Sequence, residues 1–481
     1  MTKRFAKIVC TLGPSSSDEK TIRKLIRAGL DVARLNFSHG THSEHAKRIA
    51  ILRKLSDELG KPVSILLDLQ GPKLRIGTLT QNFINLTAGQ DVILSSTNTK
   101  LEKNKDIIFI PFDVPKLHEA LKPGNHILLD DGHLEFEVTS VSAGTIIAKV
   151  LLGGKLSSHK GVNLPGANLD IPILTHKDKE DLAFGLSQGA DIIAISFVRD
   201  DKDIMMVRES IKQLSPKNSQ IPIIAKLERP EAMTNLEKIM QITDGVMVAR
   251  GDLGVEMSPA SVPVAQKEII QSANRHAKIV ITATQMLESM INNPRPTRAE
   301  ATDIANAIFD GTDAVMLSGE TAAGKYPVES IQIMDTIVRE AEKHFPQWGH
   351  VDTFQFDRTS DDAISITRAA RELAHDRNVA AIIVFTQSGR TARWMSKARP
   401  NVPILAFTPE ERTYQMMAML WGVTPLLVPY ADTLETMITH VDTAITTTTG
   451  LQPGQQVVLI SGFPVGISRK PNLALLYTLK G

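Results

Sequence analysis

Polar and charged residues stand at the ends of several strand-like apolar runs in this sequence. In ARLNFSHG, an alternation of period two places Arg34, Asn36 and Ser38 on one face. In AKLERPE, Lys226 and Glu228 share a face in the same way. Such groups are costly to bury without partners, so each set needs a ligand or an internal polar network. For Lys226 and Glu228, a structural ion pair and a functional pair both stay open.

A second carboxylate follows the next run, because Asp252 stands beside Gly251 in the glycine-rich turn ARGDLG. Glu228 and Asp252, together with substrate oxygens, suit Mg²⁺, a hard cation that is held by few protein ligands and several waters. The free backbone N–H groups of such a turn suit an anion, as at the start of a helix. The pattern predicts a magnesium site beside an anion-binding turn.

Two further runs end in hydroxyl, amide and carboxylate groups, at Thr284-Gln285 and at Ser318-Gly319-Glu320. For Ser318 and Glu320 we favour capping of the following helix, because hydroxyls and carboxylates commonly satisfy its first N–H groups. We favour a functional role for Thr284, since many of the other strand ends that face the same space are also polar.

All these residues occupy the same place in a repeated unit, which is an apolar run, a polar cluster and then a helix-length amphipathic segment. Near-continuous apolar runs are typical of parallel strands that are buried on both faces. Eight such units predict an α/β fold built on a (β/α)8 TIM barrel, with the polar ends gathered on one face. The runs begin at Ala6, Asp31, Val63, Asp191, Ile221, Asp244, Lys278 and Asp313.

The third and fourth runs are much further apart than the others. The intervening residues alternate in character and are punctuated by turns, which predicts an inserted small β-barrel domain or a small sandwich above the active-site face, where it could act as a lid. After an irregular stretch at 341–362, alternating helices and strands predict a C-terminal open α/β domain. The predicted bounds are 1–72 and 169–345 for the barrel (domain A), 73–168 for the insert (domain B) and 346–481 for domain C, which would carry the effector site and an oligomer interface.

The overall composition limits the class of partner. Lys and Arg number 54 and Asp and Glu number 53, so no net field favours nucleic acid or an anionic membrane. Cys10 is the only cysteine, which rules out an internal disulfide framework and fits a reducing compartment. No apolar stretch is long enough for a transmembrane helix. We therefore expect a cytoplasmic protein with small-molecule partners, no nucleic acid and no membrane association.

The motifs ARLNFSHG, LDLQGPKLRIG, KGVNLPG, AKLERPEA, VMVARGDLGVE, TATQMLESM, PRPTRAE and MLSGETAAGKYP together resemble the pyruvate kinase family over nearly the whole chain. The resemblance implies a phosphotransferase that converts phosphoenolpyruvate and ADP to pyruvate and ATP, the final step of glycolysis, with Mg²⁺ as cofactor. It also implies the arrangement of domains A, B and C and a homotetramer.

The resemblance also implies roles for individual residues. Arg34 and Arg75 would help to hold phosphate oxygens. The roles are catalysis for Lys226, Arg34 and Thr284; substrate binding for Arg34, Lys226, Gly251, Asp252 and Thr284; nucleotide binding for Asn36, His39, Arg75 and Lys160; and magnesium binding for Glu228 and Asp252.

One position departs from many relatives, because Lys73 in LDLQGPKLRIG stands where they carry a glutamate and typically require potassium. The potassium site of the family involves the positions of Asn36, Ser38, Asp68 and the backbone at Leu69. An ammonium group at Lys73 could supply that positive charge, and a nearby Asp68 would favour it. We therefore predict potassium independence; the alternative is that Lys73 points to solvent and the cation site persists.

In the C-terminal domain, a predicted strand runs into a turn of hydroxyls, glycine and arginine. Such a turn at a helix start could bind phosphate, although an ordinary capped connection is also possible. The resemblance implies an allosteric site for a phosphorylated metabolite, either a sugar phosphate or AMP. The residues are Thr386, Ser388, Gly389, Arg390 and Thr391.

Two other functions also stay open. A barrel lyase or aldolase that acts on a pyruvate-like substrate could use Lys226 as a Schiff-base nucleophile. The inserted domain, the strand-end arginines and His39 argue against it. The second is a catalytically silent metabolite sensor, although every expected catalytic position is filled.

Overall fold

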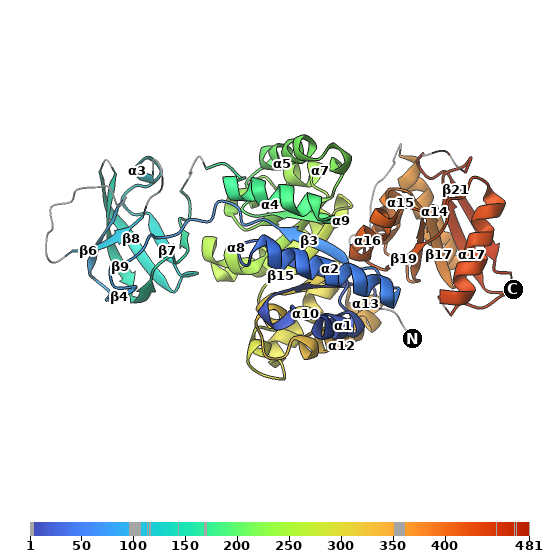
Figure 1. The fold of residues 1–481 in the computed structure, drawn as a ribbon, viewed down its shortest axis with the longest axis horizontal. Coiled ribbons are helices and arrows are strands. Elements are labelled where there is room, and N and C mark those ends of the chain that lie inside the picture. Colours follow the sequence, from blue (N-terminus) through green and yellow to red (C-terminus); the bar gives the residue numbers. More distant parts are fainter. Residues whose placement is uncertain are drawn as a thin grey trace.

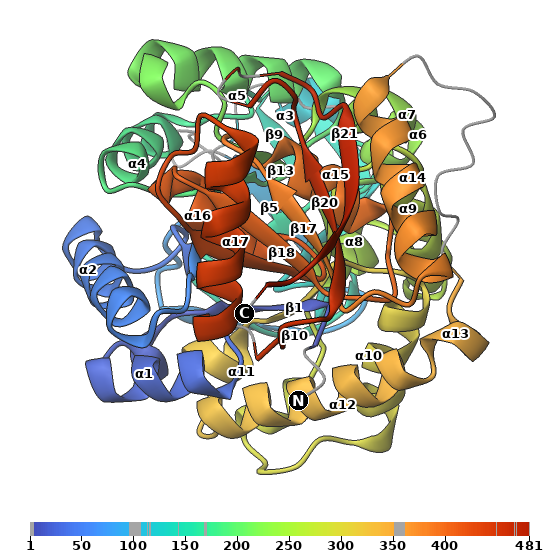
Figure 2. The ribbon, with the colours of Figure 1, turned by 90° about the vertical axis from the view of Figure 1, so that its right-hand side faces the viewer.

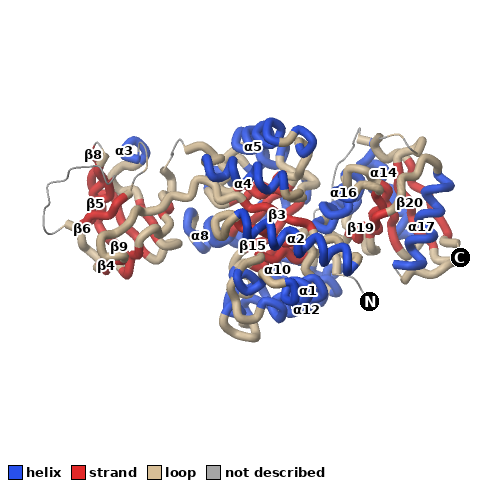
Figure 3. Tube along the Cα trace, in the orientation of Figure 1, coloured by secondary structure: helices blue, strands red, loops and turns tan. Residues whose placement is uncertain are grey.

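The computed structural model describes residues 4–95, 107–112, 114, 117–142, 144–167, 171–350, 361–448, 450–465, 467 and 469–480. Its elements form three bodies in a row, with the β-rich insert at one end, a barrel in the middle and an α/β domain at the other end (Figures 1 and 3). Among the described residues, no helix combines the length and the apolar character that crossing a membrane requires.

The middle body is a closed barrel of eight parallel strands, in the order β1-β16-β15-β14-β13-β12-β3-β2. Each apolar run predicted to form a strand does so, and the (β/α)8 barrel is confirmed. The strands are nearly fully buried, as parallel strands covered by helices should be. They are β1 (Lys7–Thr11), β2 (Val32–Asn36), β3 (Ser64–Asp68), β12 (Ile192–Ile195), β13 (Ile223–Leu227), β14 (Gly245–Ala249), β15 (Ile279–Ala283) and β16 (Ala314–Leu317).

Aspartates at the N-terminal end of alternate strands fasten the barrel. Each stands just before its strand, accepts a hydrogen bond from a backbone N–H of the preceding strand, and pairs with a lysine or arginine. The carboxylates therefore tie neighbouring strands and the surrounding helices to one end of the barrel, away from the predicted site. The backbone donors are Ile8 for Asp31, Ile65 for Asp191, Ile223 for Asp244 and Val280 for Asp313.

The helices between the strands form the outer layer of the barrel. Several begin with a side-chain cap; Thr297, for example, accepts from the Glu300 N–H, and the Glu300 carboxylate accepts from the Thr297 N–H in return. The outer helices are α1 (Glu19–Ala28), α2 (His42–Leu59), α4 (His176–Ser187), α5 (Asp201–Leu214), α7 (Leu236–Ile242), α9 (Val262–Arg275), α10 (Arg298–Phe309) and α12 (Pro327–Lys343). Shorter helices are α6 (Pro230–Thr234), α8 (Arg250–Glu256), α11 (Gly319–Ala322) and α13 (Phe345–Trp348).

The insert lies between β3 and α4 and is β-rich, as expected. Its strands pair as a six-stranded sheet, β11-β7-β8-β9-β5-β6, and a two-stranded sheet, β10-β4. Both chain connections to the barrel are fastened to Asp178, which accepts from the N–H groups of Gly71 and Thr175. The elements are β4 (Phe83–Leu86), β5 (Asp91–Ser95), β6 (Ile108–Pro111), α3 (Leu117–Ala120), β7 (His126–Leu129), β8 (Leu134–Ser142), β9 (Thr145–Leu152), β10 (Gly154–Ser157) and β11 (Val162–Asn163).

The C-terminal domain is an open sheet, β19-β18-β17-β20-β21, that is parallel except for β21. This domain packs against one end of the barrel (Figure 2). At the N-terminal ends of the barrel strands, Lys7 Nζ donates to the Val423 carbonyl and Ser64 Oγ donates to the Gln415 carbonyl. The C-terminal ends of the barrel strands therefore face the insert. The elements are α14 (Asp362–Asp376), β17 (Ala381–Phe385), α15 (Arg390–Lys397), β18 (Ile404–Thr408), α16 (Glu411–Met416), β19 (Val423–Leu427), α17 (Leu434–Thr448), β20 (Gln456–Ser461) and β21 (Leu473–Thr478).

Candidate active site

A buried charge cluster occupies the C-terminal ends of β2, β3 and β13. Lys226 Nζ lies 2.9 Å from Glu228 Oε1 and 3.3 Å from Asp68 Oδ1, and it donates to Ser196 Oγ at 2.7 Å. Arg34 Nε donates to Asp68 Oδ2 at 2.6 Å. All these side chains are nearly fully buried. The barrel therefore brings together Arg34, Asp68, Lys226 and Glu228, which lie far apart in the sequence.

Negative charge exceeds positive charge in this cluster. Asp252, in the first turn of α8, adds a third carboxylate whose charge acts on Lys226 and Glu228. Burial raises the pKa of Glu228, the charge of Lys226 opposes that shift, and the charge of Asp252 adds to it. Burial would lower the pKa of Lys226, but Asp68 and Glu228 outweigh it and hold this pKa above its ordinary value. Lys226 is therefore a charged group in the folded protein.

The excess negative charge fits a divalent cation. Glu228 and Asp252 offer carboxylate oxygens, the donors that Mg²⁺ prefers, and a cation between them would relieve their repulsion. No group of three or more His, Cys, Asp or Glu side chains in the described part of the chain has the geometry of a metal cage. A magnesium ion here would complete its coordination with water and ligand oxygens.

Two residues that the sequence analysis did not single out, Ser196 and Phe197, form hydrogen bonds with Lys226 and Glu228. Phe197 N donates to Glu228 Oε2 at 2.7 Å, and its backbone φ of 61° is in the left-handed region. Ser196 Oγ donates to the Leu69 carbonyl and accepts from Lys226. Its position at the end of the fourth predicted strand, in DIIAISFVR, is the signal that could have identified it.

Thr284 and Gly251 are joined across the ends of β14 and β15. Gly251 N donates to Thr284 Oγ1 at 2.8 Å, and Thr284 Oγ1 donates to the Ala283 carbonyl at 2.6 Å. The N–H of Gly251, in the turn expected to bind an anion, is thus satisfied by the hydroxyl of Thr284. If a ligand replaces the hydrogen bond between Gly251 N and Thr284 Oγ1, the N–H and the hydroxyl can both bind that ligand.

Glu320 behaves as the capping interpretation predicts, but Ser318 does not: its buried hydroxyl caps no helix and has no hydrogen-bond partner among the described residues. Glu320 Oε2 accepts from Ser318 N at 2.7 Å, and Glu320 Oε1 accepts from Leu287 N at 3.0 Å. The carboxylate therefore fixes the turns after β15 and β16 and has its acceptor oxygens engaged by backbone.

The candidate nucleotide residues are divided between the barrel and the insert. Asn36 Oδ1 accepts from Ser38 N at the end of β2. Arg75 Nη1 donates to the His159 carbonyl, and Lys160 Nζ lies 2.6 Å from Asp130 Oδ1. Burial lowers the pKa of His39, and the charges of Arg75, Arg34 and Lys73 lower it further, in that order. His39 therefore lies where basic groups of the barrel and of the start of the insert converge, which suits a polyanionic ligand.

The predicted potassium positions contain oxygen atoms that are already engaged. The Asp68 carboxylate pairs with Arg34 and Lys226, and among the described residues no ion pair joins it to Lys73. The side chain of Lys73 instead lies beside Gly161 of the insert, where an added Cβ would be 3.2 Å from Lys73 Cε. The charge of Lys73 acts on His39, and so on the nucleotide side of the site.

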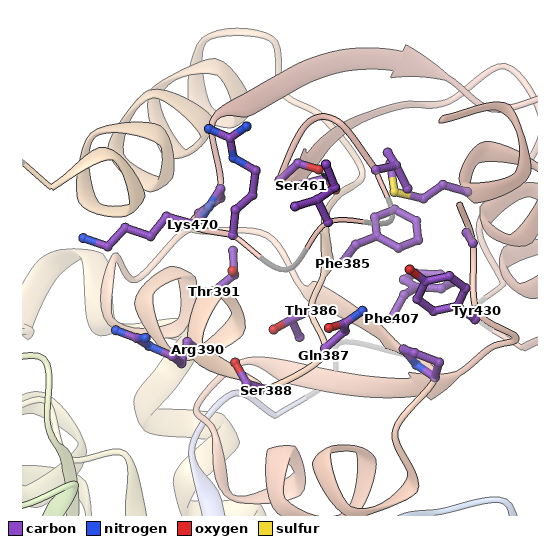
Figure 4. Close-up of a pocket in the computed structure, with 18 of the residues that line it drawn as sticks. Phe385, Thr386, Gln387, Ser388, Arg390, Thr391, Phe407, Tyr430, Ser461 and Lys470 are labelled. Atoms are coloured by element: carbon purple, nitrogen blue, oxygen red, sulfur yellow. Dashed lines mark hydrogen bonds between the residues drawn. The ribbon is translucent and has the colours of Figure 1, made fainter. Parts of the chain in front are cut away.

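A separate cavity of about 380 Å³ lies in the C-terminal domain at the turn from β17 to α15. Hydroxyl and basic side chains, including Thr386, Ser388 and Arg390, gather on one side, and the rings of Phe407 and Tyr430 lie on the other (Figure 4). Gly389, the N-cap residue just before α15, has a φ of 78°, and its N–H donates to Thr386 Oγ1. The cavity also contacts Thr391 and Lys470.

Comparison with known proteins identifies relatives along almost the entire chain. A family model described as "Pyruvate kinase, barrel domain" matches residues 3–331, and one described as "Pyruvate kinase, alpha/beta domain" matches residues 364–476. The chain is 43% identical over 478 residues to a pyruvate kinase of Sporosarcina psychrophila, covering 99% of this chain and 80% of the relative. It is 42% identical over 471 residues to a pyruvate kinase of Agrobacterium vitis, covering 98% of each.

Proposed function

The chain belongs to the pyruvate kinase family of phosphotransferases, and we propose that it transfers the phosphoryl group of phosphoenolpyruvate to ADP, giving pyruvate and ATP. The observation that carries this proposal is the buried cluster of Arg34, Lys226 and Glu228, with Asp252 beside it. Phosphoryl transfer needs positioning and charge neutralisation more than covalent help, and this cluster offers fixed charges of both signs.

The charged Lys226 also argues against the lyase interpretation. A Schiff-base nucleophile needs a neutral amine, whereas Asp68 and Glu228 keep the pKa of Lys226 raised. As an ammonium, Lys226 neutralises phosphoryl oxygens during transfer and then the enolate oxygen that remains. Arg34, which donates hydrogen bonds to Asp68 and Thr11, contributes a second fixed cation.

Glu228 and Asp252 would hold the magnesium ion. When bound, the metal supplies a Lewis acid that neutralises charge on phosphoryl and enolate oxygens. Gly251 and Asp252 offer backbone N–H groups to the substrate carboxylate, and the Thr284 hydroxyl stands beside them to pass a proton toward the enolate carbon through water. His39 and Asn36 face the nucleotide from the barrel, and Arg75 and Lys160 approach it from the insert as the lid closes.

The direct test is pyruvate formation from phosphoenolpyruvate and ADP, coupled to lactate dehydrogenase, with Mg²⁺ present. Turnover that requires both substrates supports the proposal. Failure to form pyruvate, together with borohydride trapping of pyruvate on Lys226, would favour the lyase instead, and failure of both reactions would favour the silent sensor.

We propose that this enzyme does not need potassium, because the side chain of Lys73 lies beside Gly161 and its charge acts on His39, on the nucleotide side of the site. Added potassium is expected to change the wild-type turnover by less than about twofold, while Lys73→Glu is expected to lose about tenfold and regain it with potassium. Steady-state turnover at matched ionic strength, in sodium or potassium chloride, measures both.

Lys122→Glu is the matched control, since Lys122 is an exposed residue of the insert and the charge change is the same. It should behave as the wild type in both salts. A severalfold rise in wild-type turnover on adding potassium would show that the cation site persists and that Lys73 does not replace it.

We also propose that the cavity of the C-terminal domain binds a phosphorylated effector, a sugar phosphate or AMP. Hydroxyls and Arg390 at the start of α15 suit a phosphate group, and the aromatic side suits a sugar or base. The same helix reaches the barrel, because Arg393 pairs with Asp244 before β14 and Lys397 pairs with Asp313 before β16. A ligand at one end of α15 therefore acts on an element that contacts two strands of the active-site barrel.

Arg390→Gln is expected to raise the effector concentration for half-maximal activation by about tenfold, because a charge-assisted phosphate contact is lost. Turnover at low phosphoenolpyruvate, titrated with AMP and with sugar phosphates, measures this shift. Arg377→Gln, at the exposed end of α14, is the control. An unchanged activation curve in Arg390→Gln would place the effector elsewhere.

We also propose a cytoplasmic location and a homotetramer, in keeping with the family.

A further inference from the structure

The two residues after β15 have an unusual backbone. Thr284 has a φ of 69° and Gln285 a φ of 55°. Left-handed backbone brings the Cβ of an L residue close to its carbonyl oxygen, and for a β-branched residue such as Thr284 it is rare. Strain of this kind persists only where the surrounding structure holds it.

The group that holds Thr284 is the guanidinium of Arg250. Arg250 Nη2 donates to the Thr284 carbonyl at 2.6 Å and Nε donates to it at 3.2 Å. Nε also donates to the Ala283 carbonyl at 3.3 Å. The rigid fork of the guanidinium therefore fixes two successive carbonyls at the point where the chain leaves the strand.

Arg250 is itself anchored on its far side. Nη1 pairs with Asp303 Oδ2 of α10 at 2.5 Å and donates to Gln266 Oε1 of α9 at 3.4 Å. The side chain is 8% exposed. Arg250 therefore connects the outer helices α9 and α10 to the backbone of Thr284 through a buried side chain.

The contact is reciprocal, because the Thr284 side chain in turn binds Gly251, the residue after Arg250. Gly251 N donates to Thr284 Oγ1, and an added Cβ at Gly251 would lie 3.6 Å from that oxygen. The Arg250 side chain thus holds the Thr284 backbone, and the Thr284 side chain meets the start of α8. The direction of the Thr284 hydroxyl therefore depends on the hydrogen bonds from Arg250 to the Thr284 carbonyl and on the one from Gly251 N to Thr284 Oγ1.

We propose that Arg250 is a positioning residue for the reaction: it holds Thr284 in the left-handed conformation that presents its hydroxyl at the start of α8. Arg250 acts through Thr284 and does not touch the substrate. The inference rests on the proposed function, in which the Thr284 hydroxyl serves the substrate carboxylate and the protonation of the enolate. A role confined to the ion pair with Asp303 is the structural alternative.

Arg250→Lys separates these roles, because lysine keeps the charge for Asp303 but lacks the planar fork. Two rates are measured: pyruvate formation, and exchange of the pyruvate methyl protons with deuterium oxide followed by NMR. Arg250→Lys is expected to lower the exchange rate by about 10²-fold, since a small misplacement of a reacting group has an effect of that size. In the Thr284→Ala background the same change should cost less than about twofold, because the group through which Arg250 acts is gone.

Asp303→Asn provides a second variant that does not depend on the stability of Arg250→Lys. It loosens the anchor but keeps the guanidinium, so it should lower exchange by less than about tenfold, and this loss should also disappear in the Thr284→Ala background. Arg208→Lys is the matched control. Its guanidinium likewise binds a backbone carbonyl, that of Ile221, and a carboxylate, that of Asp244, but at the opposite end of the barrel.

Losses that multiply with Thr284→Ala would overturn the proposal, as would equal losses in Arg208→Lys and Arg250→Lys. A wild-type protein that forms no pyruvate would instead refute the proposed function. The two failures are therefore distinguishable.

Discussion

Lys226→Met is expected to lower kcat for pyruvate formation by about 10³-fold or more. Methionine keeps most of the length and apolar volume of the side chain but removes the ammonium group. In the wild type this group lies within 2.9 Å of Glu228 and 3.3 Å of Asp68, in a site that excludes most water. Fixed charge in such a site stabilises the charge that develops on the phosphoryl and enolate oxygens more strongly than it would in water. The coupled assay at saturating phosphoenolpyruvate, ADP and Mg²⁺ measures the loss.

Lys278→Met is the matched control for this variant. Lys278 is also a largely buried lysine of the barrel, but it stands before β15, at the opposite end, where its Nζ donates to the Thr243 carbonyl at 2.7 Å. We expect its kcat to stay within about twofold of the wild type. If Lys226→Met kept a tenth of the wild-type kcat with its fold intact, Lys226 could not be the main source of charge stabilisation.

The strands and their polar ends were predictable because parallel strands that are buried on both faces appear in the sequence as nearly continuous apolar runs. Asp191 to Arg199 and Asp244 to Asp252 each read as an apolar run that ends in polar residues, and each ends on the same barrel face. The assignment of Glu320 to backbone hydrogen bonds was also accessible, since carboxylates near helix starts commonly accept them.

The contacts between side chains from different strands were not predictable in the same way. Asp68 was assigned to a potassium site beside Lys73, yet its carboxylate pairs with Arg34 and Lys226. Sequence proximity favours the first pairing, whereas barrel closure places β2 beside β3 and brings Lys226 of β13 within reach across β12. The roles of Ser196 and Arg250 were missed for a related reason, because their partners lie on other strands and their types are common at strand ends.

A buried charge cluster joins the barrel to the C-terminal domain at Asp313, the residue before β16. Asp313 Oδ1 accepts from Arg399 Nη2 at 2.7 Å, and Oδ2 accepts from Val280 N at 2.7 Å and from Lys397 Nζ. The three charged side chains are almost completely buried. Burial lowers the pKa of Lys397 to about 8, although the charge of Asp313 opposes this shift. One carboxylate therefore compensates two buried cations.

Asp313→Asn is expected to lower the free energy of unfolding by about 3–5 kcal/mol, because it removes the buried carboxylate that pairs with both Lys397 and Arg399. Urea unfolding followed by circular dichroism measures the loss, at a protein concentration held constant. Asp244→Asn is the matched control, since Asp244 also accepts a backbone N–H before a strand and pairs with two arginines, but its side chain is 25% exposed. Its loss should be about 1 kcal/mol or less, because water screens partly exposed pairs. Equal losses in the two variants would mean that burial is not the source of the stabilisation at Asp313, and that the two domains are held together mainly by their apolar contacts.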